Sequence, residues 1–339
     1  MKKLVYKFSS QSTQFLFDAD FSKLGKLVDK SQSVLITDEN VFRLHGSKFN
    51  GWDTIVLKPG EEYKVQETVD AVVGQLIKFQ ADRKTFLVGI GGGVVTDITG
   101  YVASIYMRGL SFGFVPTTVL AMVDASIGGK NGIDVGPYKN LVGAIKQPAF
   151  LFYDLAFLTT LPESEWTNGF AEVIKHSLIK DASMFRELEK NTISQYQKNP
   201  AALGKLIQRN TLIKAEVVKK DEFEKGERRL LNFGHTLGHA IENIYELSHG
   251  QAISIGMVAA SRLSEQITGF KETGRVMQVL AQYGLPIAAD YDRKKAFDIL
   301  KMDKKRVGKE MNYVLLKKIG NAVVESIPML KLEKRLVKL

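Results

Sequence analysis

Short apolar runs alternate with amphipathic stretches in the first part of the chain. Residues 33–37, 54–57, 85–90 and 112–115 are rich in Val, Ile, Leu and Phe, and this composition predicts buried strands. Apolar residues recur at helical spacing over residues 65–77 and predict one amphipathic helix. Strands that alternate with helices are typical of a parallel α/β sheet, which binds its ligands at the carboxyl ends of the strands.

The pattern changes after about residue 150. Residues 162–300 show mostly helical periodicity, and two short strand-like runs follow at 313–316 and 322–324. We therefore predict an α/β nucleotide-binding N-terminal domain with a parallel sheet over residues 1–148. A mainly α-helical, metal- and substrate-binding domain is predicted over residues 149–339, with the active site in the cleft between the two domains.

Composition and charge narrow the class of function. The chain has 339 residues, no cysteine, and 47 Lys+Arg against 37 Asp+Glu, which gives a formal net charge of +10. The lack of cysteine excludes disulfides, thiol catalysis and Cys-ligated zinc. The sequence carries no helix-turn-helix, aromatic platform or zinc-finger spacing, no signal peptide, and no apolar stretch long enough for a bilayer. We therefore expect a cytoplasmic protein that binds a small anionic metabolite, without a nucleic-acid or membrane partner.

A glycine run follows the third predicted strand. Gly91, Gly92 and Gly93 stand between that strand and a predicted helix, where a backbone without side chains can approach a pyrophosphate at a helix N-terminus. The run differs from the dinucleotide fingerprint because Val94 occupies the third glycine position, so a tight turn without a ligand remains an alternative. Asp38 ends an earlier strand and could bind a ribose hydroxyl or cap a helix.

Three of the five histidines lie within a short segment. His235 and His239 are four residues apart and share one helix face, and His249 follows after a short connection. Three imidazoles and a carboxylate are suitable ligands for zinc, although spacing alone does not choose two of the three. Glu172 stands in an apolar helical segment, where it could be a metal ligand or part of a solvated face. Among the basic residues, Lys130 and Arg228 stand out by their positions beside glycines and before the histidine segment.

These motifs occur together in one family. The chain contains Gly91-Gly92-Gly93-Val94-Val95-x-Asp97, Met107-Arg108-Gly109, Val115-Pro116-Thr117-Thr118, Met122-Val123-Asp124-x-Ser126-Ile127-Gly128-Gly129-Lys130, Lys139-Asn140, Ala171-Glu172-Val173-Ile174-Lys175, Asn232-Phe233-Gly234-His235-Thr236-x-Gly238-His239 and His249-Gly250. In this order, and over about residues 35 to 320, they resemble the 3-dehydroquinate synthase family of the sugar phosphate cyclase superfamily.

The resemblance implies a reaction. The family converts 3-deoxy-D-arabino-heptulosonate 7-phosphate into 3-dehydroquinate and phosphate, the second step of the shikimate pathway. NAD transiently oxidises a ring hydroxyl, phosphate leaves by β-elimination, the ring is reduced again and opens, and an intramolecular aldol reaction closes it. The net reaction is that of a carbon–oxygen lyase.

The resemblance also implies site residues. The ligands of zinc, or alternatively of cobalt, would be Glu172, His235 and His249. The catalytic groups would be His239, Glu224, Lys130 and Asp124. The phosphorylated, carboxylated sugar would contact Arg108, Asp124, Lys130, Asn140, Lys175, Lys214, Arg228, Asn232 and His239. NAD would contact Asp38, Asn40, Glu61, Lys64, Gly92, Gly93, Val94, Asp97, Thr117, Thr118, Lys139, Phe157, Leu158, Thr159 and Thr160. A homodimer is implied, in which Arg108 reaches the phosphate across the interface.

The chain departs from the family pattern at a few positions. Thr96 replaces a glycine, which is acceptable if the backbone has an ordinary helical conformation at this point. Arg229 follows Arg228 where an asparagine is usual, and the match does not choose between Lys304 and Lys305 as a further phosphate ligand.

Two alternatives remain at the level of the sequence. One is a sibling cyclase, either similar to 2-deoxy-scyllo-inosose synthase or acting on sedoheptulose 7-phosphate. Such siblings often change the residues at the positions of Arg108, Asn140 and His239, all three of which are present in this chain. The other is a metal-dependent polyol dehydrogenase with a similar two-domain layout, which would form net NADH and needs no basic phosphate pocket.

Overall fold

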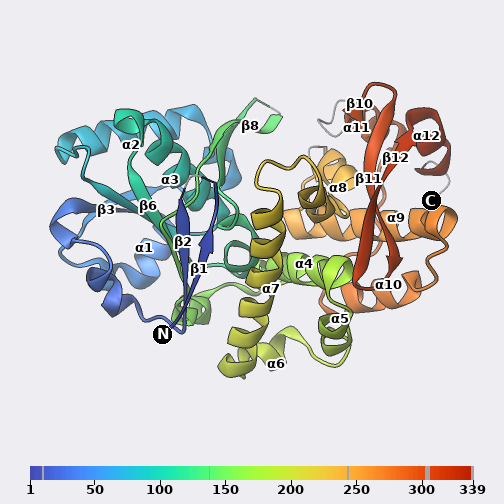
Figure 1. Cartoon of the computed structure of the whole chain (residues 1–339), viewed down its shortest axis with the longest axis horizontal. Coiled ribbons are helices and arrows are strands. Elements are labelled where there is room, and N and C mark those ends of the chain that lie inside the picture. Colours follow the sequence, from blue (N-terminus) through green and yellow to red (C-terminus); the bar gives the residue numbers. More distant parts are fainter. Residues whose placement is uncertain (10, 137, 243, 302–305, 337–339) are drawn as a thin grey trace. The chain divides into compact units, whose positions relative to one another are not determined.

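The computed structural model describes residues 1–9, 11–136, 138–242, 244–301 and 306–336 (Figure 1). Lys304 and Lys305 lie outside these ranges. By its internal contacts, the chain divides into two compact units, one formed by residues 1–165 and 200–222 and the other by residues 166–199 and 223–339.

The first unit is built on a seven-stranded sheet with the strand order β1-β2-β9-β6-β5-β3-β4. Its strands are β1 (Lys2–Lys7), β2 (Ser12–Phe17), β3 (Ser33–Asp38), β4 (Asp53–Leu57), β5 (Phe86–Gly91), β6 (Ser111–Pro116) and β9 (Phe150–Phe152). Only the β1–β2 pair is antiparallel; the other neighbouring pairs are parallel. The predicted parallel α/β sheet is therefore confirmed.

Most helices of this unit lie between consecutive strands in the chain. They are α1 (Glu39–His45), α2 (Gln66–Lys78), α3 (Gly93–Ile105) and α7 (Pro200–Lys220), with the short 3-10 helices η1 (Phe21–Lys26), η2 (Lys30–Gln32), η3 (Gly46–Phe49), η4 (Glu61–Tyr63), η5 (Tyr106–Arg108) and η7 (Leu155–Thr160) and the π-helical turn η6 (Ala121–Ala125). Helix α2 confirms the predicted amphipathic helix and buries Val69, Val72 and Leu76. Strands β7 (Lys130–Val135) and β8 (Tyr138–Ile145) form a separate antiparallel pair.

The register of the parallel strands brings several chain segments to one edge of the sheet. Thr37 is paired with Ile90, and Gly91 is paired with Pro116. The ends of β3, β5 and β6 therefore lie next to one another. Asp38 and Gly91 are the last residues of β3 and β5, and Thr117 directly follows β6. The candidate nucleotide residues therefore occupy the edge where α/β sheets bind ligands.

The compact units differ from the predicted division at 148/149. Strand β9 lies between β2 and β6 in the sheet, so the segment after residue 148 still belongs to the first unit. Helix α7 also belongs to it, because the Thr211 hydroxyl donates a hydrogen bond to the Met122 carbonyl and Glu222, just after the helix, accepts one from Gln147. These contacts join residues far apart in the sequence, which periodicity does not reveal.

The second unit is mainly helical, as predicted. It contains most of α4 (Glu163–Lys180), together with α5 (Ala182–Leu188), α6 (Ile193–Gln197), η8 (Glu227–Asn232), α8 (His235–Glu242), α9 (His249–Thr268), α10 (Thr273–Gln282), α11 (Arg293–Leu300) and α12 (Met329–Leu336). Strands β10 (Arg306–Val307), β11 (Glu310–Lys318) and β12 (Asn321–Pro328) form an antiparallel sheet and include the two predicted strand-like runs.

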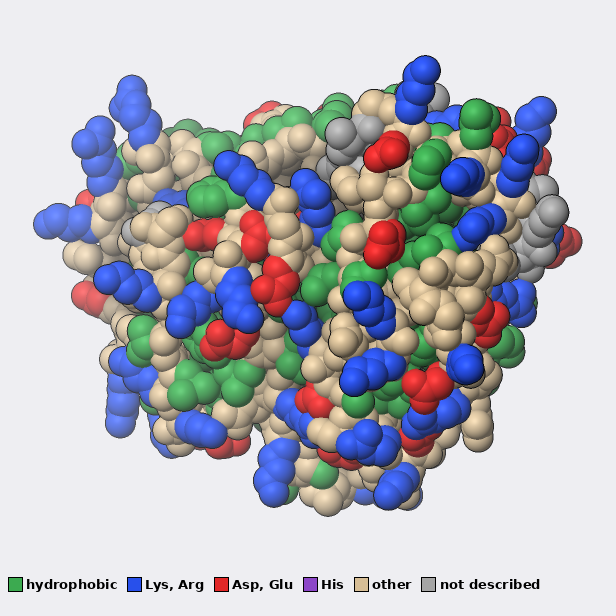
Figure 2. Space-filling model, turned by 45° about the vertical axis from the view of Figure 1, so that its right-hand side comes forward, with side chains coloured by type: hydrophobic (Ala, Val, Ile, Leu, Met, Phe, Trp, Pro, Cys, Tyr) green, Lys and Arg blue, Asp and Glu red, His purple; other side chains and the backbone are tan. Residues whose placement is uncertain are grey.

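Charged side chains of both signs are dispersed over the face shown in Figure 2. On the face in Figure 2, the Lys and Arg side chains are scattered and interspersed with Asp and Glu. The +10 net charge therefore does not collect into a single basic patch on this face, as a nucleic-acid footprint would require. Among the described residues, no helix combines the length and apolar composition that a bilayer crossing needs.

Candidate functional site

The glycine run forms a tight strand-to-helix turn. Gly92 is the N-cap of α3, and the helix begins at Gly93. A Cβ atom on Gly91 would lie 2.5 Å from a methyl group of Val95, and one on Gly92 would lie 3.3 Å from a methyl group of Thr118. The first N–H groups of a helix have no partner within the helix and carry its positive dipole end. A backbone that excludes side chains at this point has the shape and polarity to receive a phosphate group.

Thr96 fits into this turn without strain. It lies in α3, has no positive φ, and its hydroxyl donates a hydrogen bond to the Gly93 carbonyl at 2.9 Å. The backbone at Thr96 therefore has the ordinary helical conformation in which a threonine can replace the family's glycine.

A buried lysine connects three acidic side chains next to the turn. Lys64 is 4% exposed, and its Nζ lies 2.5 Å from Glu61, 3.6 Å from Asp97 and 3.7 Å from Asp134. Burial disfavours the charged form of Lys64, but attraction to Asp97 and Glu61 prevails and raises its pKa. Burial raises the pKa of Asp97 to about 7, against the lowering effect of Lys64. Glu61, Lys64 and Asp97, three of the predicted NAD contacts, thus form one cluster.

The other predicted NAD contacts lie in the same unit. Asp38 is the N-cap of α1 and accepts a hydrogen bond from the Val41 N–H at 2.9 Å, so the helix-cap interpretation is confirmed. Asn40 follows in α1, Thr117 donates its N–H to the Gly91 carbonyl, and Lys139 lies in β8. Phe157 to Thr160 belong to η7, which the Thr160 hydroxyl joins to His45 Nε2 at 2.8 Å.

In the second unit, Glu172, His235 and His249 come together from three helices. Glu172 lies in α4 and is fully buried, whereas the two histidines begin α8 and α9. Glu172 Oε1 lies 3.5 Å from His235 Nε2 and 3.3 Å from His249 Nε2. Ligands about 2.0–2.1 Å from a tetrahedral zinc ion are separated by roughly 3.3–3.4 Å, so these distances fit such a centre. The solvated-face interpretation of Glu172 is wrong, because its side chain is buried.

The distal nitrogens of the two histidines also face oxygen atoms. His235 Nδ1 lies 3.1 Å from the Phe233 carbonyl, and His249 Nδ1 lies 3.5 Å from Glu242 Oε2. Burial, reinforced by the Lys175 charge, lowers the pKa of His235 well below its usual value, which favours the neutral form that binds metals. Burial acts in the same direction on His249, but hydrogen bonds and attraction to Glu172 and Glu242 prevail and raise its pKa to about 9.

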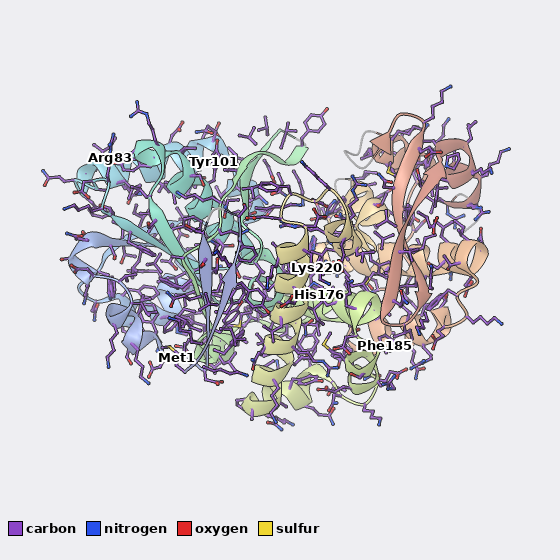
Figure 3. The ribbon with its side chains drawn as sticks, viewed as in Figure 1. Met1, Arg83, Tyr101, His176, Phe185 and Lys220 are labelled. Carbon is purple, nitrogen blue, oxygen red and sulfur yellow. The ribbon has the colours of Figure 1, made fainter. Side chains whose placement is uncertain are left out.

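His239 lies beside this cluster. Its ring centroid is 5.1 Å from that of His235 and 6.3 Å from that of His249. His239, Glu242 and His249 also have possible ligand atoms within 4.8 Å of one another, so His249 is shared by two candidate groups. His176, labelled on α4 in Figure 3, is fully buried and was not among the predicted site residues.

Further predicted residues belong to the same unit as the histidines. Lys175 forms an ion pair with Glu172, and Asn232 Nδ2 donates a hydrogen bond to Glu224 Oε1 at 2.6 Å. Arg228 is 2% exposed, whereas Arg229 is only partly buried. The burial of its guanidinium favours Arg228 over Arg229 as the arginine of the site.

The remaining predicted substrate contacts belong to the first unit. Lys214 Nζ lies 2.8 Å from the Asp124 carboxylate and donates a hydrogen bond to the Asp124 carbonyl at 2.7 Å. Lys130 begins β7. Asn140 and Arg108 have positive φ angles of 52° and 68°, a backbone conformation that is uncommon for residues other than glycine.

Sequence reasoning did not identify Glu242 and Asp134. Glu242 repeats the helical face of His235 and His239 at the i, i+4, i+7 spacing, so this pattern could have indicated it. Asp134 reaches Lys64 from a hairpin strand, and the sequence carries no signal of that contact.

Comparisons with known proteins cover nearly the whole chain. A family model described as 3-dehydroquinate synthase N-terminal matches residues 54–168, and one described as 3-dehydroquinate synthase C-terminal matches residues 169–306. The 3-dehydroquinate synthase of Pyrococcus abyssi is 36% identical over 97% of this chain and 96% of its own length.

Solved structures share the fold. The 2-epi-5-epi-valiolone synthase of Streptomyces hygroscopicus, solved with NAD+ and Zn2+ bound, is 28% identical with a TM-score of 0.89, over 99% of this chain and 98% of that one. A 2-deoxy-scyllo-inosose synthase complexed with carbaglucose-6-phosphate, NAD+ and Co2+ has a TM-score of 0.86 at 24% identity, over 99% of this chain and 100% of that one.

Proposed function

Because this chain belongs to the 3-dehydroquinate synthase family, we propose that it carries out the family's reaction with NAD and a divalent metal ion bound at the residues described above. That reaction, a lyase step of the shikimate pathway, converts 3-deoxy-D-arabino-heptulosonate 7-phosphate into 3-dehydroquinate and phosphate. The observation that carries the metal dependence is the convergence of Glu172, His235 and His249 at the spacing of a tetrahedral ligand set.

Glu172, His235 and His249 would hold zinc, or cobalt in its place. A metal ion there supplies a Lewis acid that lowers the pKa of bound substrate hydroxyls. The Phe233 carbonyl would keep the proton of His235 on Nδ1 and so leave Nε2 for the metal. Lys175, paired with Glu172, would bring a positive charge next to this centre for an anionic substrate.

The NAD site would use the turn of the first unit. Bound NAD supplies a reversible hydride acceptor, so the net reaction is not a redox reaction. Gly92, Gly93 and Val94 would offer backbone N–H groups to the pyrophosphate at the start of α3. Lys64 and Asp97 would orient the nucleotide through hydrogen bonds, with Glu61 and Asp134 fixing the lysine. This role is supported by the burial of Lys64 and by its contacts with the three carboxylates.

Proton transfer would depend on His239 and Glu224. His239 lies beside the metal ligands, with its ring centroid 5.1 Å from that of His235, and its imidazole would exchange protons with a substrate held there. The Glu224 carboxylate accepts a hydrogen bond from Asn232. The backbone of Glu224 has a positive φ of 57°, a strained conformation that is often retained at functional sites. Asp124, Lys130 and Lys214 would orient the substrate from the first unit, with Lys214 fixing Asp124.

The chain would act as a homodimer. Ile105 and Met107, which shortly precede Arg108 in the chain, are 44% and 42% exposed, and several apolar side chains of the β7–β8 pair are exposed as well. Exposed apolar side chains in one neighbourhood are typical of a surface covered by another protein. Arg108 would then reach the phosphate of the second copy. Analytical ultracentrifugation tests this proposal, which predicts twice the chain mass; a monomer at catalytic concentrations would contradict it.

A substrate panel tests the proposed reaction. Purified protein with NAD and zinc is offered 3-deoxy-D-arabino-heptulosonate 7-phosphate, glucose 6-phosphate, sedoheptulose 7-phosphate and glycerol, and the products are identified by mass spectrometry. We expect 3-dehydroquinate from the first substrate alone. Cyclisation of one of the other two sugar phosphates would instead assign the chain to a sibling cyclase, and NADH from glycerol would indicate a polyol dehydrogenase.

A further inference from the structure

The two candidate histidine ligands have different partners on their distal nitrogens. His235 Nδ1 faces a neutral backbone carbonyl, whereas His249 Nδ1 faces the carboxylate of Glu242 at 3.5 Å. The side chain of Glu242 is only 7% exposed, so this carboxylate is largely withdrawn from water. Burying a carboxylate is costly unless it has a charged or hydrogen-bonding partner, and the His249 imidazole is such a partner for Glu242.

The packing of α8 against α9 fixes the distance between Glu242 and His249. A Cβ atom on Gly238 would lie 2.7 Å from Ile253, and one on Gly256 would fall almost on the Gly234 carbonyl oxygen, at 1.9 Å. These glycines let the two helices approach closely, and larger residues would separate them. Glu242 ends α8 and His249 begins α9, so the close packing holds the carboxylate and the imidazole next to each other.

The backbone of His249 is fixed independently of Glu242. Ser248 and Gln251 form a capping box at the start of α9, and the Gly250 N–H donates a hydrogen bond to Asn168 Oδ1 at 2.5 Å. These contacts place the Cα of His249 but leave the rotation of its ring open. The ring is constrained instead from its two nitrogens, by Glu172 on Nε2 and by Glu242 on Nδ1.

We propose that Glu242 is a positioning residue of the metal centre: its carboxylate accepts the Nδ1–H of His249 and so holds Nε2 toward the site shared with Glu172 and His235. The inference rests on the metal site of the proposed function. Carboxylates that orient a metal-bound histidine in this way fix its tautomer and strengthen it as a ligand. Glu242 is therefore not a ligand itself, although it also belongs to the group formed with His239 and His249.

The test measures zinc affinity rather than turnover. Metal-free full-length protein is titrated with zinc in competition with a chromophoric chelator, for the wild type and the variants Glu242→Gln, Glu242→Leu and Glu246→Gln. Glu246 is an exposed carboxylate four residues further along the chain, outside α8, and serves as the matched control. We expect one zinc per chain in all four proteins, with affinity reduced about 10- to 100-fold in both Glu242 variants and unchanged in the control.

Further readouts separate positioning from a loss of folding. The melting temperature of the metal-free variants should stay close to that of the metal-free wild type, and kcat at saturating zinc should largely recover. Wild-type affinity in both Glu242 variants would overturn the inference while leaving the metal site intact. Two zinc ions per wild-type chain, with only one lost on substitution, would make Glu242 a ligand instead. A wild type that binds no zinc would overturn the metal site itself, together with this inference.

Discussion

The Nε2 atom of His235 lies 3.5 Å from Oε1 of Glu172, a carboxylate that has no exposed surface. His249 Nε2 lies 3.3 Å from the same oxygen, so one buried carboxylate serves two imidazoles that come from different helices. Glu172 Oε2 is paired with Lys175, whereas Oε1 faces the two Nε2 atoms at the spacing of ligands around one ion. A divalent metal ion held by Oε1 and the two imidazoles fits this arrangement, and the site therefore has the character of a metal centre.

Substitution of His235 should remove the metal. His235→Ala deletes one of three protein ligands, and we expect the variant to purify without stoichiometric zinc and without activity. Inductively coupled plasma mass spectrometry of the dialysed protein measures the zinc content. Full zinc occupancy in this variant would show that His235 is not a ligand.

Substitution of His239 should separate metal binding from catalysis. His239 lies beside the three-ligand set and is proposed to move a proton, so His239→Ala should retain one zinc per chain while kcat falls roughly 10²–10⁴-fold. Zinc content and steady-state rates, measured on the same preparation, test this expectation. An unchanged kcat would leave His239 with a structural role only, and loss of zinc would make it a ligand.

The ionisation of Asp97 should make stability depend on pH. Its pKa is about 7 in the folded chain, above its unfolded value, so the folded state binds the extra proton between about pH 4 and 7. The protonated form of Asp97 therefore stabilises the folded state at low pH, and this contribution to the free energy of unfolding is lost as the pH rises through about 7. The slope approaches about 1.4 kcal/mol per pH unit within that window.

Urea unfolding at several pH values, with Asp97→Asn as the comparison, measures this dependence. The asparagine variant cannot ionise, so the free energy of unfolding of the wild type should fall relative to that of the variant as the pH rises from 4 to 7. Parallel curves for the two proteins would show that Asp97 does not titrate in this range.

Two glycines should respond in opposite ways to the same substitution. Gly91→Ala places a Cβ 2.5 Å from Val95 and should destabilise the turn by about 1–3 kcal/mol, with weaker NAD binding. Gly74 lies within α2, and no atom lies within 4 Å of an added Cβ, so Gly74→Ala should stabilise the chain by up to about 1 kcal/mol. Chemical denaturation and NAD titration measure both effects. Equal stability of the two variants would contradict the close packing of the turn.

Local patterns predicted the elements whose apolar residues follow a continuous run or a helical period along the chain. Strands β3 and β5 and helix α2 appear in the sequence as apolar runs and helical periodicity, and the structure confirms them. Strand β9 spans only Phe150–Phe152 and is held by neighbours distant in the sequence, so its short apolar run gave no separate signal.

The site was predictable where rare residue types cluster. His235, His239 and His249 stand out by composition, but the choice of Glu172 as their partner came from the family resemblance. The roles of Glu242 and Asp134 depend on helix packing and on a hairpin contact, respectively, which only the folded chain displays. The positive φ of Arg108 and Glu224 was likewise not predictable, because arginine and glutamate ordinarily avoid that conformation.

Simultaneous recording of phosphate and NADH shows whether the protein runs a closed redox cycle at a metal centre. The protein is given 3-deoxy-D-arabino-heptulosonate 7-phosphate and a catalytic amount of NAD, with zinc, after chelation, and after zinc is restored. We expect one phosphate per substrate consumed, no net NADH, loss of phosphate release on chelation and its recovery with zinc. Accumulation of NADH in proportion to substrate, or phosphate release that persists without metal, would contradict it.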